Sequence, residues 1–171
     1  MSDIFDGPAY PQHPSHSNPF WFEYFELAKL ARHLLAKREN GYPKLVYSQI
    51  MTQEAADAAI HNMTGAATVM HAMIGYSEIG QLPATRWAMH DDLTAAAKRA
   101  REMADKHPRS EPHQHTAWGT EAIAYWLQPW DRKTRYASKS LAEHIHNLNL
   151  QLRAQAKEDR AKRAESERQA A

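Results

Sequence analysis

The chain contains no cysteine and few of the residues that build strands and large cores. It has two valines among 171 residues, and Leu, Ile, Val and Phe together make up about 15% of the sequence. The absence of cysteine excludes a disulfide framework, a thiolate metal site and a cysteine nucleophile. Because strands favour β-branched residues, two valines argue against a β-rich fold. The large apolar residues suffice only for a small core.

The sequence also lacks a long apolar run and an excess of charge of one sign. No stretch approaches the 18 or so apolar residues that a transmembrane helix needs, and residues 1–6 are acidic where a signal peptide is basic. The formal net charge is +1, so no global field attracts the chain to nucleic acid. We therefore expect a cytoplasmic protein without a membrane partner, in which any contact with nucleic acid comes from a local patch.

Apolar residues recur at spacings of three and four along most of the chain, which predicts an all-α fold of about five helices. Asn18 and Pro19 have the residue types of a helix start, and Asn40-Gly41 predicts the end of that helix because Pro43 disfavours its continuation. Thr52 is a suitable N-cap for the second helix. Two helices joined by about ten residues predict a central antiparallel hairpin over residues 19–74.

Three further helices are expected after the hairpin. Pro83 predicts the start of the third, and a polar loop over residues 107–115 precedes a fourth that opens at Thr116. The last helix is expected to begin near Ser138 and to be long, because its sequence keeps a high helix propensity to the end. Its apolar stripe consists of Leu141, Ile145, Leu148, Leu152 and Ala156.

This pattern divides the chain into three parts. We expect an irregular, proline-rich arm over residues 1–18, a single helical domain over residues 19–152, and a charged tail over residues 153–171 that is helical or disordered. A thin core and amphipathic helices leave helix faces that need cover. We therefore expect a homo-oligomer or docking onto another protein.

One segment of the hairpin resembles known proteins. Residues 38–46, Arg-Glu-Asn-Gly-Tyr-Pro-Lys-Leu-Val, precede Met-Thr-Gln-Glu-Ala-Ala-Asp at 51–57, followed by Ile60 and Met63. This resembles a segment common in small phage and prophage proteins of uncharacterised function, in which Tyr-Pro-x-x-Val and Met-Thr-x-Glu-x-Ala-Asp flank a polar gap. Residues 47–50 replace the glycine that is usual in that gap. The resemblance implies a helical hairpin and a phage context, and it implies no activity.

Paired carboxylates give an alternative interpretation with catalysis. Glu23 and Glu26 lie in the first helix, and Glu54 and Asp57 in the second. Residues three apart share a helix face, and four converging carboxylates could hold Mg²⁺, which prefers oxygen ligands. The pattern resembles that of the all-α, MazG-like nucleotide pyrophosphohydrolases. That resemblance implies a magnesium cofactor and nucleoside triphosphate substrates.

A third motif mixes aromatic and basic residues after the fourth helix. Residues 126–136 contain Trp130, Arg132, Arg135 and Tyr136, a composition typical of binding hot spots. Aromatic rings also stack on nucleic-acid bases while arginines meet phosphates. A tryptophan-rich turn packed between two helices would have the same composition. The spacings His113-x-His115 and Glu143-x-x-His146 raise a metal site as a further alternative.

Two classes of function follow from these motifs. The first is a small phage- or prophage-type accessory protein that binds a protein partner through Trp130, Arg132, Arg135 and Tyr136, without cofactor or catalysis. Nucleic acid is the alternative partner of that surface, as in a DNA-binding regulator. The second class is a magnesium-dependent pyrophosphohydrolase that uses Glu23, Glu26, Glu54 and Asp57.

Overall fold

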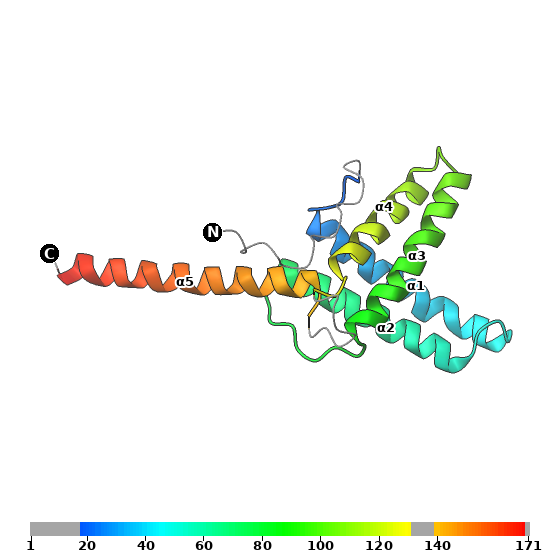
Figure 1. Cartoon of the computed structure of the whole chain (residues 1–171), viewed down its shortest axis with the longest axis horizontal. Coiled ribbons are helices and arrows are strands. Elements are labelled where there is room, and N and C mark those ends of the chain that lie inside the picture. Colours follow the sequence, from blue (N-terminus) through cyan, green and yellow to red (C-terminus); the bar gives the residue numbers. More distant parts are fainter. Residues whose placement is uncertain (1–17, 131–138, 170–171) are drawn as a thin grey trace, which may run out of the picture.

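The computed structural model describes residues 18–130 and 139–169, and this part of the chain is helical without a named strand (Figure 1). A single isolated antiparallel bridge joins Pro129 and Ser140 in it. The expected all-α fold with a long C-terminal helix is therefore confirmed. The helices are α1 (Tyr24–Tyr47), α2 (Gln53–Gly75), α3 (Arg86–Lys106), α4 (Glu111–Trp126) and α5 (Leu141–Gln169).

Helices α1 and α2 form the expected antiparallel hairpin. Thr52 caps α2, because its side-chain oxygen accepts a hydrogen bond from the Ala55 amide at 3.2 Å. Arg38 joins the hairpin to α3: Nη1 donates to the Ala59 carbonyl at 2.6 Å and to the Asp92 carboxylate at 2.5 Å. Since Arg38 is buried, this group of contacts fixes where the three helices cross.

The predicted ends of α1 are wrong at both termini. Asn18 accepts from the Phe20 amide at 2.9 Å and donates to the Trp118 carbonyl at 2.8 Å, so it closes a turn before the helix rather than the helix itself. At the other end α1 continues through Pro43 to Tyr47. Pro43 removes one backbone hydrogen bond, and the half-buried Leu45 and Val46 keep this last part helical by packing.

Helices α3 and α4 form a second hairpin that the sequence did not predict (Figure 1). Helix α3 begins at Arg86 rather than near Pro83, because Thr85 caps it by accepting from the Ala88 amide. Helix α4 begins at Glu111, within the stretch expected to be a loop. Pro112 is compatible with this start, since the first turn of a helix needs no amide donor.

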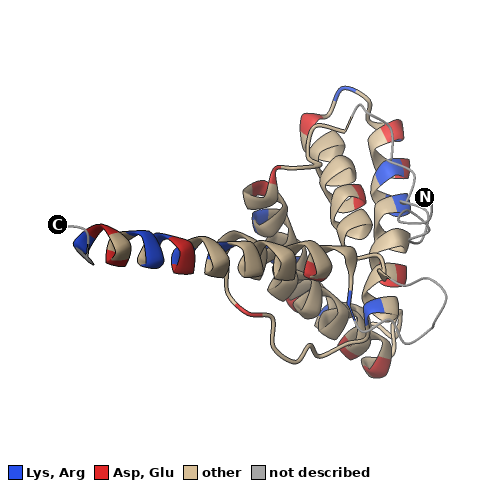
Figure 2. Ribbon diagram, turned by 60° about the vertical axis from the view of Figure 1, so that its left-hand side comes forward, with Lys and Arg blue, Asp and Glu red and all other residues tan. Residues whose placement is uncertain are grey.

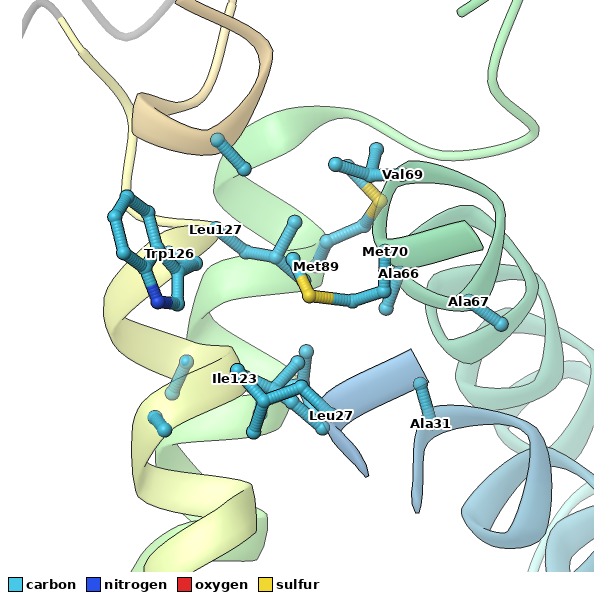
Figure 3. Packing of buried hydrophobic residues seen from close by; sticks show 14 of the residues in the cluster. Leu27, Ala31, Ala66, Ala67, Val69, Met70, Met89, Ile123, Trp126 and Leu127 are labelled. Atoms are coloured by element: carbon cyan, nitrogen blue, oxygen red, sulfur yellow. The ribbon is translucent and has the colours of Figure 1, made fainter. Parts of the chain in front are cut away.

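The core lies where α1, α2, α3 and α4 meet (Figure 3). Leu27, Met70, Met89 and Ile123 are fully buried there, one from each helix. Glycines permit the close crossings: a Cβ at Gly65 would overlap Met89, and one at Gly119 would overlap Leu30. Gly65 therefore brings α2 against α3.

Candidate protein-binding surface

Helix α5 leaves the body of the molecule and extends away from it (Figure 1). Its first turns pack on α2 and α4. Every residue from Gln151 to Arg168 is exposed. Acidic and basic residues alternate along this outer part (Figure 2). Eighteen helical residues, about 27 Å of helix, therefore stand in solvent.

The start of α5 is fixed by a capping box. The Glu143 carboxylate accepts from the Ser140 amide at 2.7 Å and from its hydroxyl at 2.8 Å, and the Ser140 hydroxyl accepts from the Glu143 amide at 3.3 Å. This reciprocal pairing satisfies backbone donors that a helix start leaves free. The helix consequently begins at Leu141, slightly later than expected near Ser138.

Arg86 connects this cap to α3. Its guanidinium donates two hydrogen bonds to Glu143, from Nη2 at 2.5 Å and from Nε at 3.1 Å. Burial alone would raise the pKa of Glu143, but the hydrogen bonds from Arg86 and Ser140 outweigh it and hold that pKa below its ordinary value. Glu143 is therefore a buried carboxylate with a complete set of donors, and it serves as the anchor of α5.

Two further polar contacts attach α5 to the loop that follows α2. His146 is buried, and its Nε2 donates to the Ser77 carbonyl at 2.7 Å. The Arg153 guanidinium lies 3.8 Å from the centre of the Tyr76 ring, a cation–π contact. Glu143, His146 and Arg153 share one face of the helix, since they follow at steps of three and seven residues. These polar contacts add to the apolar ones that Leu141 and Ala142 make with the core at the start of the helix.

The leucines of the apolar stripe lie on the opposite face of α5. At 3.6 residues per turn, Leu148 and Leu152 point roughly away from the side that carries the three polar anchors. Leu148 is 43% exposed and Leu152 is 68% exposed. Leu141, at the start of the stripe, is buried in the core, and Ile145 is half-buried against it. The stripe therefore runs out of the core into solvent. We call Ile145, Leu148 and Leu152 the leucine face.

Trp130, one of the predicted binding residues, lies beside this face. Its ring stacks on His144 of α5, with centroids 4.0 Å apart and planes 11° apart. Its amide donates to the Lys139 carbonyl at 3.0 Å, and the Leu141 amide donates to the Gln128 carbonyl at 2.9 Å. Trp130 is half-buried at this junction. The other predicted binding residues, Arg132, Arg135 and Tyr136, lie outside the described residues.

The four predicted magnesium ligands do not come together. Glu23 and Glu26 lie at the start of α1, whereas Glu54 and Asp57 lie at the start of α2, which is the opposite end of an antiparallel hairpin. Arg38 of α1 contacts the Ala59 carbonyl, two residues after Asp57, so this part of α1 lies beside the start of α2. Glu26 lies twelve residues before Arg38, which places it about 18 Å away along the helix axis. The geometry that the pyrophosphohydrolase interpretation requires is therefore not present.

The histidine motifs are engaged in local contacts instead. His113 lies 2.6 Å from the Ser110 hydroxyl and stacks on His107, while His115 packs edge-on against Phe20. Glu143 and His146 have different partners, as described above. Within residues 18–130 and 139–169, no group of three or more His, Asp or Glu side chains is placed to hold a metal ion.

A shallow pocket of about 240 Å³ lies between α1 and α4. Phe20 and Leu30 contribute apolar surface, while the other lining residues are polar. They include Glu26 and Lys29, which form an ion pair at 3.0 Å. Because this pair is exposed and its two charges cancel, the pocket offers no buried charge that would select a ligand.

The tip of the α1–α2 hairpin exposes a second apolar surface. Tyr47 is 92% exposed and Ile50 is 73% exposed. Both lie in the gap of the segment that resembles phage proteins, next to Gln49, whose backbone is left-handed (φ 57°). Neither side chain packs against the core cluster, whereas the leucine face is continuous with it.

The sequence pattern identified the stripe of α5 but not its orientation. The sequence predicted uncovered helix faces in general, but it did not predict that Leu148 and Leu152 would be among the exposed residues. The sequence signal that bears on the orientation of α5 is the capping box Ser140-x-x-Glu143, because Glu143 also pairs with Arg86 of the body. None of the helices in the described ranges is long and apolar enough to span a membrane. No protein-family model, curated protein or solved structure matches the chain.

Proposed function

We propose that the protein is a small accessory protein of phage or prophage type that acts by binding another polypeptide on the leucine face of α5. The observation that carries the proposal is an apolar stripe that begins in the core at Leu141 and becomes exposed at Leu148 and Leu152. Glu143, His146 and Arg153 hold the other side of the helix to the body, so Leu148 and Leu152 face solvent. Leucines on the open side of a helix that continues the core suit a partner that would complete their burial.

The isolated outer part of α5 also supports a binding role. Helices of this length without tertiary contacts are marginally stable in water, because most helical stability comes from packing. A partner that covers the helix would supply that packing. The segment at residues 38–63 supports the phage context by its resemblance alone.

A protein partner fits α5 better than nucleic acid does. Residues 153–171 contain six basic and four acidic side chains, and the two signs alternate along the helix (Figure 2). A phosphate backbone requires a surface of mainly positive charge. Mixed charges that follow an apolar stripe along a helix are compatible with pairing to another helix.

The proposal is tested by comparing two double variants as baits. L148N/L152N removes the exposed leucines of α5, and Y47N/I50N removes the exposed apolar residues of the hairpin tip as a matched control. Each bait captures proteins from a lysate of the source organism, and bound proteins are quantified by mass spectrometry against the wild type.

We expect a partner bound by the wild type and the tip variant to be lost, at least tenfold, from the α5 variant. Hydrogen exchange at residues 148–168 should slow when that partner is added to the purified wild type. Equal recovery by all three baits would contradict the assignment of the surface, and unchanged exchange with a bound partner would place binding elsewhere.

A further inference from the structure

We infer that the polypeptide that covers the leucine face is a second copy of this chain, with the two α5 helices crossing antiparallel at Leu148 and Leu152. This inference rests on the proposed function and names the partner of the same surface. In such a crossing Leu148 of each copy packs against Leu152 of the other. The contact is isologous, which means that the same self-complementary patch on each copy forms the whole interface.

The charge pattern of α5 favours a self-contact at this position. Residues 144–152 contain no Asp, Glu, Lys or Arg, although the helix is highly charged from Arg153 onward. Asn149 and Gln151 flank the leucines and are neutral. An interface between identical surfaces brings like charges together unless its centre is uncharged. The neutral window surrounds the two leucines.

An antiparallel arrangement is favoured over a parallel one by both charge and area. The face that carries Leu148 and Leu152 continues to Gln155 and Asp159, so a parallel pair would place two Asp159 carboxylates side by side. In the antiparallel pair, the outer part of each α5 instead runs back past Trp130 and His144 of the other copy. Both of these side chains are half-buried and retain surface for the contact.

The area that this arrangement covers is close to what a stable dimer needs. The exposed part of α5 offers a strip about 27 Å long and about 10 Å wide. Two such strips and the two surfaces they cover amount to about 1,000 Å², which lies just below the range of stable interfaces and is typical of weak, transient ones. A parallel pair of the same tails would cover about half of that area. The dimer should therefore be reversible and depend on protein concentration.

The test begins with the mass of the purified full-length chain by sedimentation equilibrium from low to high micromolar concentration. We expect the wild type to reach twice the monomer mass of 19.5 kDa. The variants W130A and L148N/L152N should shift the midpoint at least tenfold upward in concentration, and Y47N/I50N should not. Circular dichroism establishes that each variant is folded. A wild type that stays monomeric throughout would overturn the inference.

Disulfide trapping then determines the orientation, because the chain has no native cysteine. The single variants L148C and L152C are mixed and oxidised. An antiparallel dimer gives mainly the mixed L148C–L152C product, whereas a parallel dimer gives the two homodimeric products and would overturn the inferred geometry. If the wild type is monomeric but L148N/L152N still loses a captured partner, the inference of a second copy is refuted and the proposed function is not. A monomer that captures nothing through α5 would refute the proposed function as well.

Discussion

At the scale of single residues, the structure separates glycines that packing requires from those it does not. Gly41 lies inside α1, and no atom lies within 4 Å of a Cβ built there. Gly65 also lies inside a helix, but its Cβ would overlap the sulfur of Met89, which is fully buried and has little room to move. Both positions have helical backbone, so the substitution to alanine isolates the effect of packing.

We predict opposite effects for the two substitutions. G41A should raise the free energy of unfolding by about 0.5–1 kcal/mol, because alanine loses less backbone entropy than glycine in a helix. G65A should lower it by about 1–3 kcal/mol, because the methyl group overpacks the core. Urea unfolding measures both. A stabilising G65A would show that α2 and α3 do not cross as closely as the structure has them.

Glu143 gives a pH-dependent prediction at the same scale. Its pKa in the folded state lies below the ordinary value of 4.5. Its contribution to the free energy of unfolding is therefore complete above pH 4.5 and is lost as the pH falls through the lower, folded-state pKa. E143Q should cost about 2–3 kcal/mol at pH 7, because a charge-assisted pair with Arg86 is broken in a buried site.

The stability difference between E143Q and the wild type should shrink as the pH falls from 5 to 3. Urea unfolding at pH 7, 5, 4 and 3 measures it. E26Q is the matched control, because Glu26 belongs to an exposed pair whose loss should cost at most about 1 kcal/mol. If the cost of E143Q did not change between pH 7 and pH 3, the anchor would not depend on the charge of Glu143.

At the scale of elements, the sequence was sufficient for helix type and number but not for every boundary. Periodicity predicted the five helices, and Thr52 marked the start of α2 correctly. Pro43 was interpreted as a helix breaker and Pro112 was expected in a loop, yet both lie within helices. Pro43 is tolerated because the residues after it pack against the fold, and Pro112 is tolerated because it lies in the first turn of α4. Local signals cannot show which of these tertiary effects applies.

The candidate surface was predictable to a similar degree. The stripe of α5 and Trp130 were found from composition and spacing, and Trp130 does lie next to that stripe. The direction in which the stripe faces depends on where Arg86 and Ser77 lie in the fold. These partners are separated from α5 by more than fifty residues. In the same way, the spacing of the four predicted magnesium ligands did not show that the two pairs lie at opposite ends of the hairpin.

The continuity of α1 through Pro43 is itself testable. P43A should raise the free energy of unfolding by about 1–2 kcal/mol. It removes a helix-interior proline that costs about 3 kcal/mol, and the more flexible unfolded chain cancels part of that gain. Pro43 is exposed, so no packing is lost. P112A is the control and should change stability by less than about 1 kcal/mol, since α4 tolerates proline in its first turn. A neutral P43A in urea unfolding would mean that the helix is interrupted there.

At the scale of the whole molecule, the body and the outer part of α5 have separate tasks. The core is built from the first four helices and the start of α5, whereas the residues from Gln151 to Arg168 are exposed. Arg153 makes the last side-chain contact with the body that is described, its stacking on Tyr76. The outer helix therefore adds little to the stability of one isolated copy. We expect its role to be the binding of the polypeptide that covers it.

This separation predicts the result of truncating the chain after Leu152. At low micromolar concentration the melting temperature should fall by less than about 4 °C, because one exposed cation–π contact contributes about 0.5–1 kcal/mol. At high concentration the wild type should melt at a higher temperature than when dilute, because association stabilises the folded state by mass action. The truncated chain should show no such increase. Calorimetry at two concentrations measures both effects. A large loss of stability in the dilute truncated chain would show that the outer helix supports the body directly, and α5 would then be part of the fold rather than an arm for binding.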